Sequence, residues 1–154
     1  MAGEEVRPFP FGAARRSFTG VTLANQRIRI KYLRRPDGEL LSEVWFGPDS
    51  EGAPGLVHGG AVLTVLDEAM GAACWIRGLP VLTARLNAVF RRGVPLETPL
   101  TAETAVGRTR GRLSSMAGRL VGADGTLFAE AEGSFIRLTD AQMKERFGQT
   151  VTGL

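Results

Sequence analysis

Two adjacent carboxylates, Asp67 and Glu68, lie in the middle of an almost unbroken apolar run between Pro54 and Ala73. The run, PGLVHGGAVLTVLDEAMGAA, also contains the single histidine of the chain, His58, followed directly by two glycines. Asp and Glu are rarely buried unless they are paired or functional, because removing an ionised carboxylate from water costs several kcal/mol. The two acids therefore either mark the solvent-facing stripe of a helix or belong to a functional site.

The residues around these acids predict a buried helix from Ala61 to Arg77, because apolar side chains occur on nearly every side of it. No cation lies three or four residues from Asp67 to neutralise it. The glycines before the helix place unpaired backbone N–H groups at its first turn, where the helix dipole favours negative charge and a ligand can approach closely. An oxyanion hole and a carboxylate are two parts that acyl-transfer hydrolysis requires. This combination favours the functional interpretation, and the alternative makes His58 a plain helix cap and Asp67 a surface acid.

Most of the remaining chain is predicted to form antiparallel strands. Asp-Gly turns at 37–38 and 124–125 each predict a hairpin, because Asp-Gly favours tight two-residue turns. The first turn is expected to join strands 27–34 and 39–46, and the second to join strands 112–121 and 126–138. Further strands are expected at 81–90 and 100–108, and a short, more polar helix at 140–148.

The strand from Val81 to Phe90 alternates between two sides. Its apolar side is expected to carry Leu82, Ala84, Leu86, Ala88 and Phe90, and its other side Thr83, Arg85 and Asn87. A long exposed strand edge would result, and proteins generally pair or cover such an edge. The chain is therefore expected to form an oligomer.

The order of two strands, a buried helix and four strands predicts an α+β fold. We expect one antiparallel sheet of about six strands wrapped around a single long central helix. A chain of 154 residues is long enough for one domain with a substantial core, so one domain is expected over 1–154. Its core spans about 27–138, flanked by an N-terminal segment and the short C-terminal helix.

The composition argues against several other classes of protein. The net charge is +3, but the basic residues are interleaved with acids rather than gathered in a block, so we expect no nucleic-acid partner. No apolar run could cross a membrane, no signal peptide is evident, and the single cysteine fits a reducing compartment, so we expect a cytoplasmic protein with no membrane partner. One histidine and one cysteine cannot form a zinc site of the usual kind, so we expect no metal.

The segment PGLVHGGAVLTVLDEAMG resembles the signature of hot-dog-fold acyl-CoA thioesterases, in particular the phenylacetate-pathway-like branch. The segment LTARLNAVFRRGVPL is similar to the next strand of that branch, and the resemblance covers roughly Leu40 to Leu138. It implies a hydrolase that converts an acyl-CoA thioester to a free acid and coenzyme A. The only cofactor would be the coenzyme A of the substrate. The resemblance also implies a homodimer or homotetramer with active sites at the subunit interface.

The resemblance further implies roles for particular residues. Asp67 would be the base or the nucleophile, Gly59 the backbone donor to the thioester carbonyl, His58 the residue that holds the donor loop, and Thr83 a hydroxyl that helps to place the attacking water. Contacts to the substrate are expected from Gly60, Asn87, Arg91, Arg92 and Arg112, with Arg91 and Arg92 as first choice for the phosphates of coenzyme A. The chain departs from several relatives at Gly52, where they have an asparagine six residues before the histidine.

Two other functions remain open from the sequence. A non-catalytic hot-dog domain that binds acyl-CoA is one of them, although the presence of Asp67 argues against it. A hot-dog dehydratase or hydratase is the other, but those enzymes use a histidine as a chemical participant, and the one histidine here directly precedes Gly-Gly.

Overall fold

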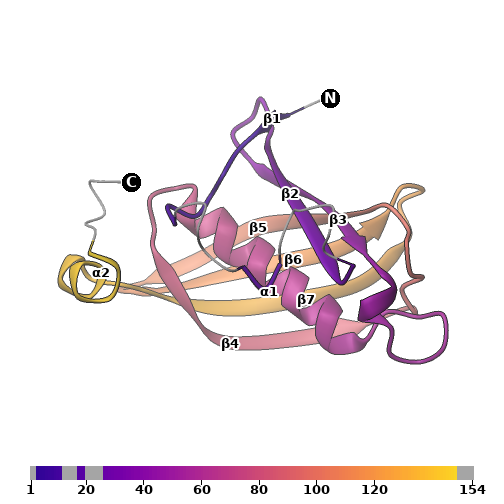
Figure 1. The fold of residues 1–154 in the computed structure, drawn as a ribbon. Coiled ribbons are helices and arrows are strands. Elements are labelled where there is room, and N and C mark those ends of the chain that lie inside the picture. The colour runs from indigo at the N-terminus through magenta and orange to yellow at the C-terminus, as the bar shows by residue number, and fades with distance from the viewer. Residues whose placement is uncertain (1–2, 12–16, 20–25, 149–154) are drawn as a thin grey trace.

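The computed structural model describes residues 3–11, 17–19 and 26–148. A seven-stranded antiparallel sheet curves around one long helix, α1 (Gly59–Trp75), as Figure 1 shows. The strands are β1 (Glu4–Glu5), β2 (Ile28–Arg34), β3 (Leu40–Phe46), β4 (Val81–Phe90), β5 (Leu100–Arg110), β6 (Leu113–Gly122) and β7 (Leu127–Arg137), in the spatial order β1-β2-β3-β5-β6-β7-β4. A 3₁₀ turn, η1 (Pro48–Ser50), precedes α1, and a short helix, α2 (Asp140–Phe147), follows β7.

The antiparallel sheet around a central helix confirms the α+β prediction. Both predicted hairpins are present, since β2 pairs with β3 and β6 pairs with β7. The sheet has one strand more than expected because Glu4 and Glu5 pair with the end of β2. A two-residue strand shows no alternation that a sequence pattern could reveal.

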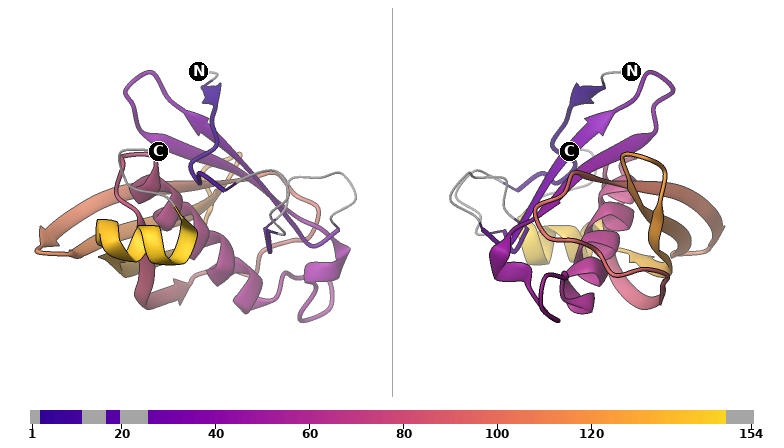
Figure 2. Two further views of the ribbon diagram at one scale, coloured as in Figure 1. Left: turned by 60° about the vertical axis from the view of Figure 1, so that its left-hand side comes forward. Right: turned by 90° about the vertical axis from the view of Figure 1, so that its right-hand side faces the viewer.

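Helix α1 forms the centre of the core and lies along the concave side of the sheet (Figure 2). It is largely buried because its sheet-facing side is continuously apolar. It begins at Gly59, two residues earlier than predicted, and ends at Trp75 rather than Arg77. Its buried residues are Val62, Val65, Leu66 and the seven residues from Ala69 to Trp75.

Strand β4 lies at one edge of the sheet and contains a bulge between Thr83 and Arg85. A bulge adds one residue to a strand and reverses the alternation of side chains beyond it. The predicted alternation was therefore wrong for the first half of this strand. Thr83 faces α1, where it bonds to a helix side chain, whereas Leu82 is 43% exposed.

The two flanking segments meet at the C-terminal end of α1. Rings of Phe9 and Phe11, from the N-terminal segment, pack edge-on against Trp75 with centroids 6.0 and 5.4 Å away. Phe147, at the end of α2, packs against Phe11 at 5.1 Å. The segments before and after the predicted core are thus joined by one aromatic cluster.

Candidate active site

His58 caps the N-terminus of α1. Its Nδ1 accepts a hydrogen bond from the Gly60 N–H at 2.8 Å, which satisfies one of the four N–H groups that a helix leaves unpaired. A Cβ at Gly60 would lie 3.0 Å from that same nitrogen, so a larger residue here would make the ring shift by a few tenths of an ångström. The backbone of His58 is held in turn by its N–H, which donates to the carbonyl of Ser50 at 2.8 Å. The His-Gly-Gly motif is therefore a cap that fixes the first turn.

This geometry predicts opposite responses at the two glycines of the motif. Gly60→Ala should lower the free energy of unfolding by up to about 1 kcal/mol, because the added Cβ displaces the ring and weakens the cap bond. Gly59→Ala should leave stability unchanged or slightly higher, since its Cβ would lie 3.7 Å from Phe90, at ordinary contact distance. Urea unfolding of both variants beside the wild type measures the difference. Equal effects at the two positions would contradict the capping role of His58.

The N–H of Gly59 is open. No residue in the described part of the chain accepts a hydrogen bond from it, and Gly59 is exposed. The ring of Phe90, at the end of β4, lies beside it and is itself 53% exposed. An N–H at a helix N-terminus beside an apolar ring can donate to a carbonyl oxygen that develops negative charge.

Asp67 lies two turns further along α1 and is half-buried. The Thr83 hydroxyl of β4 donates to its Oδ1 at 2.6 Å. Burial raises the pKa of the Asp67 carboxyl above its usual range, and the Thr83 hydrogen bond opposes part of this shift. Among the described residues, the Thr83 hydroxyl is the one side-chain group that donates to Asp67. A carboxylate that is partly removed from water and has no cation beside it is suited to act as a base or a nucleophile.

Glu68, the second acid, faces a different part of the structure. Its Oε1 accepts a hydrogen bond at 2.9 Å from the hydroxyl of Thr19, which is buried in the N-terminal segment. Adjacent residues on a helix point about 100° apart, so the two acids serve different neighbours. Neither acid belongs to a plain solvent-facing stripe.

The distance between the two candidate catalytic groups limits what one chain can do. Gly59 and Asp67 are separated by eight residues of one continuous helix. This separation is about 12 Å along the helix axis at 1.5 Å per residue. A single thioester carbonyl cannot contact both groups of the same chain.

The arginines predicted to bind phosphate lie in two places. Arg91 and Arg92 directly follow β4 and anchor there through backbone bonds to the carbonyl of Phe128, close to the end of α1 that Phe90 contacts. The guanidinium of Arg91 also pairs with Glu130 at 3.2 Å. Arg112 instead donates to the carbonyl of Arg137 and to Gln142 of α2, so the structure does not bring it together with Asp67.

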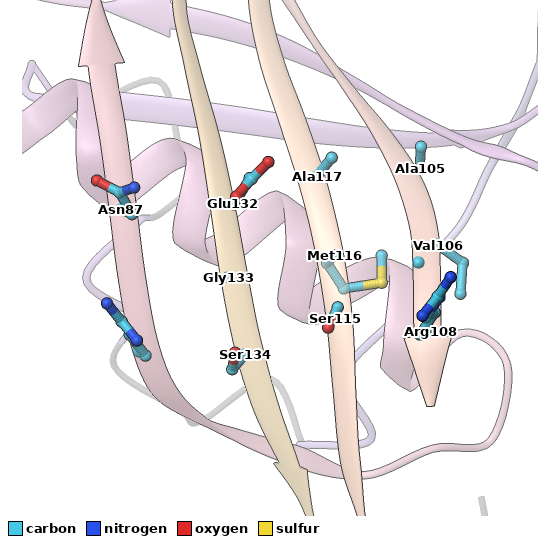
Figure 3. A pocket seen from close by; sticks show the side chains of 12 residues that line it. Asn87, Ala105, Val106, Arg108, Ser115, Met116, Ala117, Glu132, Gly133 and Ser134 are labelled. Carbon is cyan, nitrogen blue, oxygen red and sulfur yellow. The ribbon is translucent and has the colours of Figure 1, made fainter. Parts of the chain in front are cut away.

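Asn87 is not brought together with Asp67 either. Its side chain lies on the face of the sheet opposite α1, in a shallow pocket with Ala117 and Glu132 (Figure 3). Residues on either side of it, Leu86 and Ala88, are half-buried and pack against the core. The alternation of β4 beyond its bulge accounts for this placement.

The departure at Gly52 has a local structural cause. A Cβ at this position would lie 2.8 Å from the Cα of His58, closer than real side chains approach backbone. The N–H of Gly52 also donates to the carbonyl of Leu56, which closes the loop before the cap. An asparagine side chain at position 52 would need a different loop.

Sequence reasoning missed two residues of this region, Phe90 beside Gly59 and Thr19 on Glu68. Phe90 was assigned to the apolar side of its strand, as a core residue or a pocket-lining one, and nothing local connects it to a glycine 31 positions away. Thr19 is 49 residues from Glu68 in the chain. No pattern in the sequence could have paired either residue with α1.

Within residues 3–11, 17–19 and 26–148, no group of three or more His, Cys, Asp or Glu side chains is placed to hold a metal ion. No helix in the described part of the chain has the length and apolar character needed to cross a membrane.

Comparisons with known proteins give a consistent result. Residues 54–129 match the model of the thioesterase superfamily. The bovine acyl-coenzyme A thioesterase THEM4 is 39% identical over 93 residues, which cover 60% of this chain and 38% of the relative. This chain thus matches well under half of the length of that relative.

Solved structures agree with this assignment. A crystal structure of a thioesterase superfamily protein is 31% identical, with a TM-score of 0.65, over 70% of this chain and 53% of the other. The BH2602 protein from Bacillus halodurans, solved with CoA, is 26% identical with a TM-score of 0.63, over 70% of this chain and 72% of the other. The fold and the sequence therefore point to the same family.

Proposed function

We propose that this chain is a member of the thioesterase superfamily, and that it is an enzyme that hydrolyses acyl-CoA thioesters to a free carboxylic acid and coenzyme A. The observation that carries the proposal is the state of Asp67. It is a half-buried carboxylate on an apolar helix, with its pKa raised by burial and one oxygen bonded to Thr83. Structural acids are usually paired with a cation, whereas this one has the environment of a catalytic base.

The proposed reaction uses groups of the chain alone. The thioester carbonyl oxygen accepts a hydrogen bond from the open Gly59 N–H, which stabilises the charge that develops when the carbonyl is attacked. Asp67 either takes a proton from the attacking water or attacks the carbonyl itself, and the carbon–sulfur bond then breaks to release the coenzyme A thiolate, which takes up a proton. In the second route the acyl group is left on Asp67 as an anhydride, and a water molecule then hydrolyses it to the free acid and restores the carboxylate. His58 acts through the loop by holding the Gly59 N–H in place. No metal or further cofactor takes part in this scheme.

We further propose that each active site is shared by two chains. Because Gly59 and Asp67 of one chain are about 12 Å apart along α1, the carbonyl must contact Gly59 of one subunit and Asp67 of another. Strand β4 supports this arrangement, since it is an edge strand whose outer side pairs with no strand in the described part of the chain, and it holds Thr83 beside Asp67 and Phe90 beside Gly59. Antiparallel pairing of two β4 edges about a two-fold axis would bring the Thr83 end of one strand toward the Phe90 end of the other.

The same arrangement gives the substrate an orientation. Arg91 and Arg92 follow Phe90 at the edge of the site, where their guanidinium groups can bind the phosphates of coenzyme A. The acyl group would then extend away from them, past the first turn of α1.

The direct test is an acyl-CoA hydrolysis screen that measures released thiol and spans aryl, short-chain and long-chain substrates. Turnover with at least one substrate supports the proposal. Binding of acyl-CoA with no hydrolysis would indicate a non-catalytic acyl-CoA-binding domain instead. Release of water or addition of water across the acyl chain, with the thioester intact, would indicate a dehydratase or hydratase.

Thr83 provides a more specific prediction. Thr83→Val removes the hydroxyl that bonds to Asp67, and kcat should fall by about tenfold or more while KM changes less, because the hydroxyl acts on the chemical step. The hydrogen bond lowers the pKa of Asp67, so its loss should raise that pKa. Asp67 must be ionised to act. The acidic limb of the plot of kcat against pH should therefore move to higher pH.

Thr83→Ser is the matched control because it keeps the hydroxyl, and it should restore both kcat and the pH profile. A change in KM alone, with an unmoved acidic limb, would make Thr83 a substrate-binding residue.

A further inference from the structure

A cavity of about 340 Å³ lies beside the first turn of α1, next to Gly60. It is bounded by α1, by η1 with the start of β2, and by Phe18 of the N-terminal segment. We propose that this cavity, the α1 chamber, receives the acyl group of the substrate, and that Phe18 sets the length of the acyl group that fits. The inference rests on the proposed thioesterase function and goes beyond it by naming the substrate class.

The position of the α1 chamber follows from the two glycines of the motif. Gly59 faces Phe90 and offers the open N–H, whereas Gly60, the next residue around the helix, lines the chamber. A carbonyl bound to the Gly59 N–H therefore has the chamber on one side and the strand end that leads to Arg91 on the other. From the bound carbonyl, the acyl group can extend into the chamber and the coenzyme A part can extend toward Arg91.

The hydroxyl groups that line the α1 chamber offer no free proton to a ligand. The Thr64 hydroxyl donates to the carbonyl of Gly60 at 2.8 Å, and the buried Ser50 hydroxyl donates to the carbonyl of Arg27. Both protons are thus already bound to the backbone. Ile28, which is fully buried, and Ala61 add apolar surface. This apolar part of the lining suits a hydrocarbon group, and the charged side chains of Arg27, Asp49 and Glu51 form the rest of the wall.

The N-terminal wall of the α1 chamber is held by Glu68. The hydrogen bond between Glu68 and Thr19 ties the N-terminal segment to α1. Phe18, which directly precedes Thr19, lines the chamber, and 64% of its surface is exposed. The Arg27 guanidinium lies 5.8 Å from the centre of the Phe18 ring. Phe18 is therefore placed as an outer wall that solvent reaches from behind, and Glu68 is a positioning residue for that wall.

The charges that line the α1 chamber exclude some acyl groups. Asp49 and Glu51 contribute two carboxylates against the single cation of Arg27. A second carboxylate on the acyl group would be repelled there. The volume suits an uncharged aryl or medium-chain acyl group of on the order of ten non-hydrogen atoms, each taking about the 30 Å³ of a water molecule.

The experiment compares kcat/KM for acetyl-, octanoyl-, benzoyl-, succinyl- and palmitoyl-CoA. The wild type should prefer octanoyl- or benzoyl-CoA to palmitoyl- and succinyl-CoA. Thr64→Phe fills the α1 chamber and should lower kcat/KM for octanoyl-CoA by on the order of tenfold more than for acetyl-CoA. Phe18→Ala opens the outer wall and should raise the ratio of palmitoyl- to octanoyl-CoA by at least severalfold.

The matched control is Thr109→Phe, the same substitution at an exposed position of β5, which should keep the wild-type profile. Phe18→Ala keeps the test decisive if Thr64→Phe fails to fold, because Phe18 is largely exposed. A second readout is the gain in affinity of octanoyl-CoA over coenzyme A in Asp67→Asn protein, which Thr64→Phe should reduce.

Three results would overturn the inference while leaving the thioesterase function in place. These are an equal loss on every substrate in Thr64→Phe, an unchanged chain-length profile in Phe18→Ala, and a wild-type preference for succinyl-CoA. A wild type that hydrolyses none of the substrates would overturn the proposed function, and the inference with it.

Discussion

Replacing Asp67 with asparagine is expected to lower kcat by about 10²-fold or more while the protein stays folded. Asparagine keeps the volume of the side chain and can still accept the hydrogen bond from Thr83. It cannot take a proton or form a bond to the thioester carbon, so both proposed roles of the carboxylate are lost. Thiol release at saturating substrate measures the effect, and thermal unfolding shows whether the fold is kept.

Glu68→Gln is the matched control, one residue further along the same helix. Glutamine can still accept from the Thr19 hydroxyl, and its side chain points away from Thr83. Its loss of kcat should therefore be far smaller than that of Asp67→Asn. Comparable turnover in purified Asp67→Asn protein and wild type would remove Asp67 from the mechanism.

Mixed dimers of two inactive variants are expected to recover activity. Asp67→Asn removes the proposed base, and Gly59→Trp blocks the open N–H beside Phe90, so neither variant alone should turn over substrate. In a mixed dimer with shared sites, one site combines the intact Gly59 of the first chain with the intact Asp67 of the second. The other site has both defects, so about half of the wild-type activity per dimer is expected if the two sites are independent.

The experiment requires co-expression of the two variants with different tags and purification through both tags, so that only mixed dimers are assayed. Wild-type chains carrying the same two tags set the reference activity. An absence of recovery in verified mixed dimers would mean that both groups act from one chain. A monomeric mass in solution would contradict the shared site itself.

Much of the fold could be predicted from residues that are neighbours in the sequence. The Asp-Gly pairs at 37–38 and 124–125 form the turns of the two predicted hairpins, because they adopt tight-turn geometry with little help from the rest of the chain. The long apolar run forms α1 to within two residues at each end. The resemblance to hot-dog thioesterases, read from the residues around His58 and Asp67, is confirmed at the level of the family.

The candidate site was predicted less completely. Asp67 and the glycines before the helix were singled out from the residues themselves, Thr83 and the individual roles came from the resemblance, and the catalytic roles stay predictions. The contact between Thr83 and Asp67 depends on the bulge in β4. A two-residue alternation cannot reveal a bulge, since the extra residue is set by how β4 matches the register of β7.

The sequence by itself thus determined the two hairpins, the long helix and the order of the strands other than β1, because turn chemistry and apolar periodicity act over a few residues. Its residues around His58 and Asp67 carried the resemblance to the family. Only the tertiary structure decided what each acid contacts. Thr83 reaches Asp67 from an edge strand, and Thr19 reaches Glu68 from a segment 49 residues earlier. Both contacts arise when the sheet and the N-terminal segment pack around α1, and packing brings together residues that no local pattern connects.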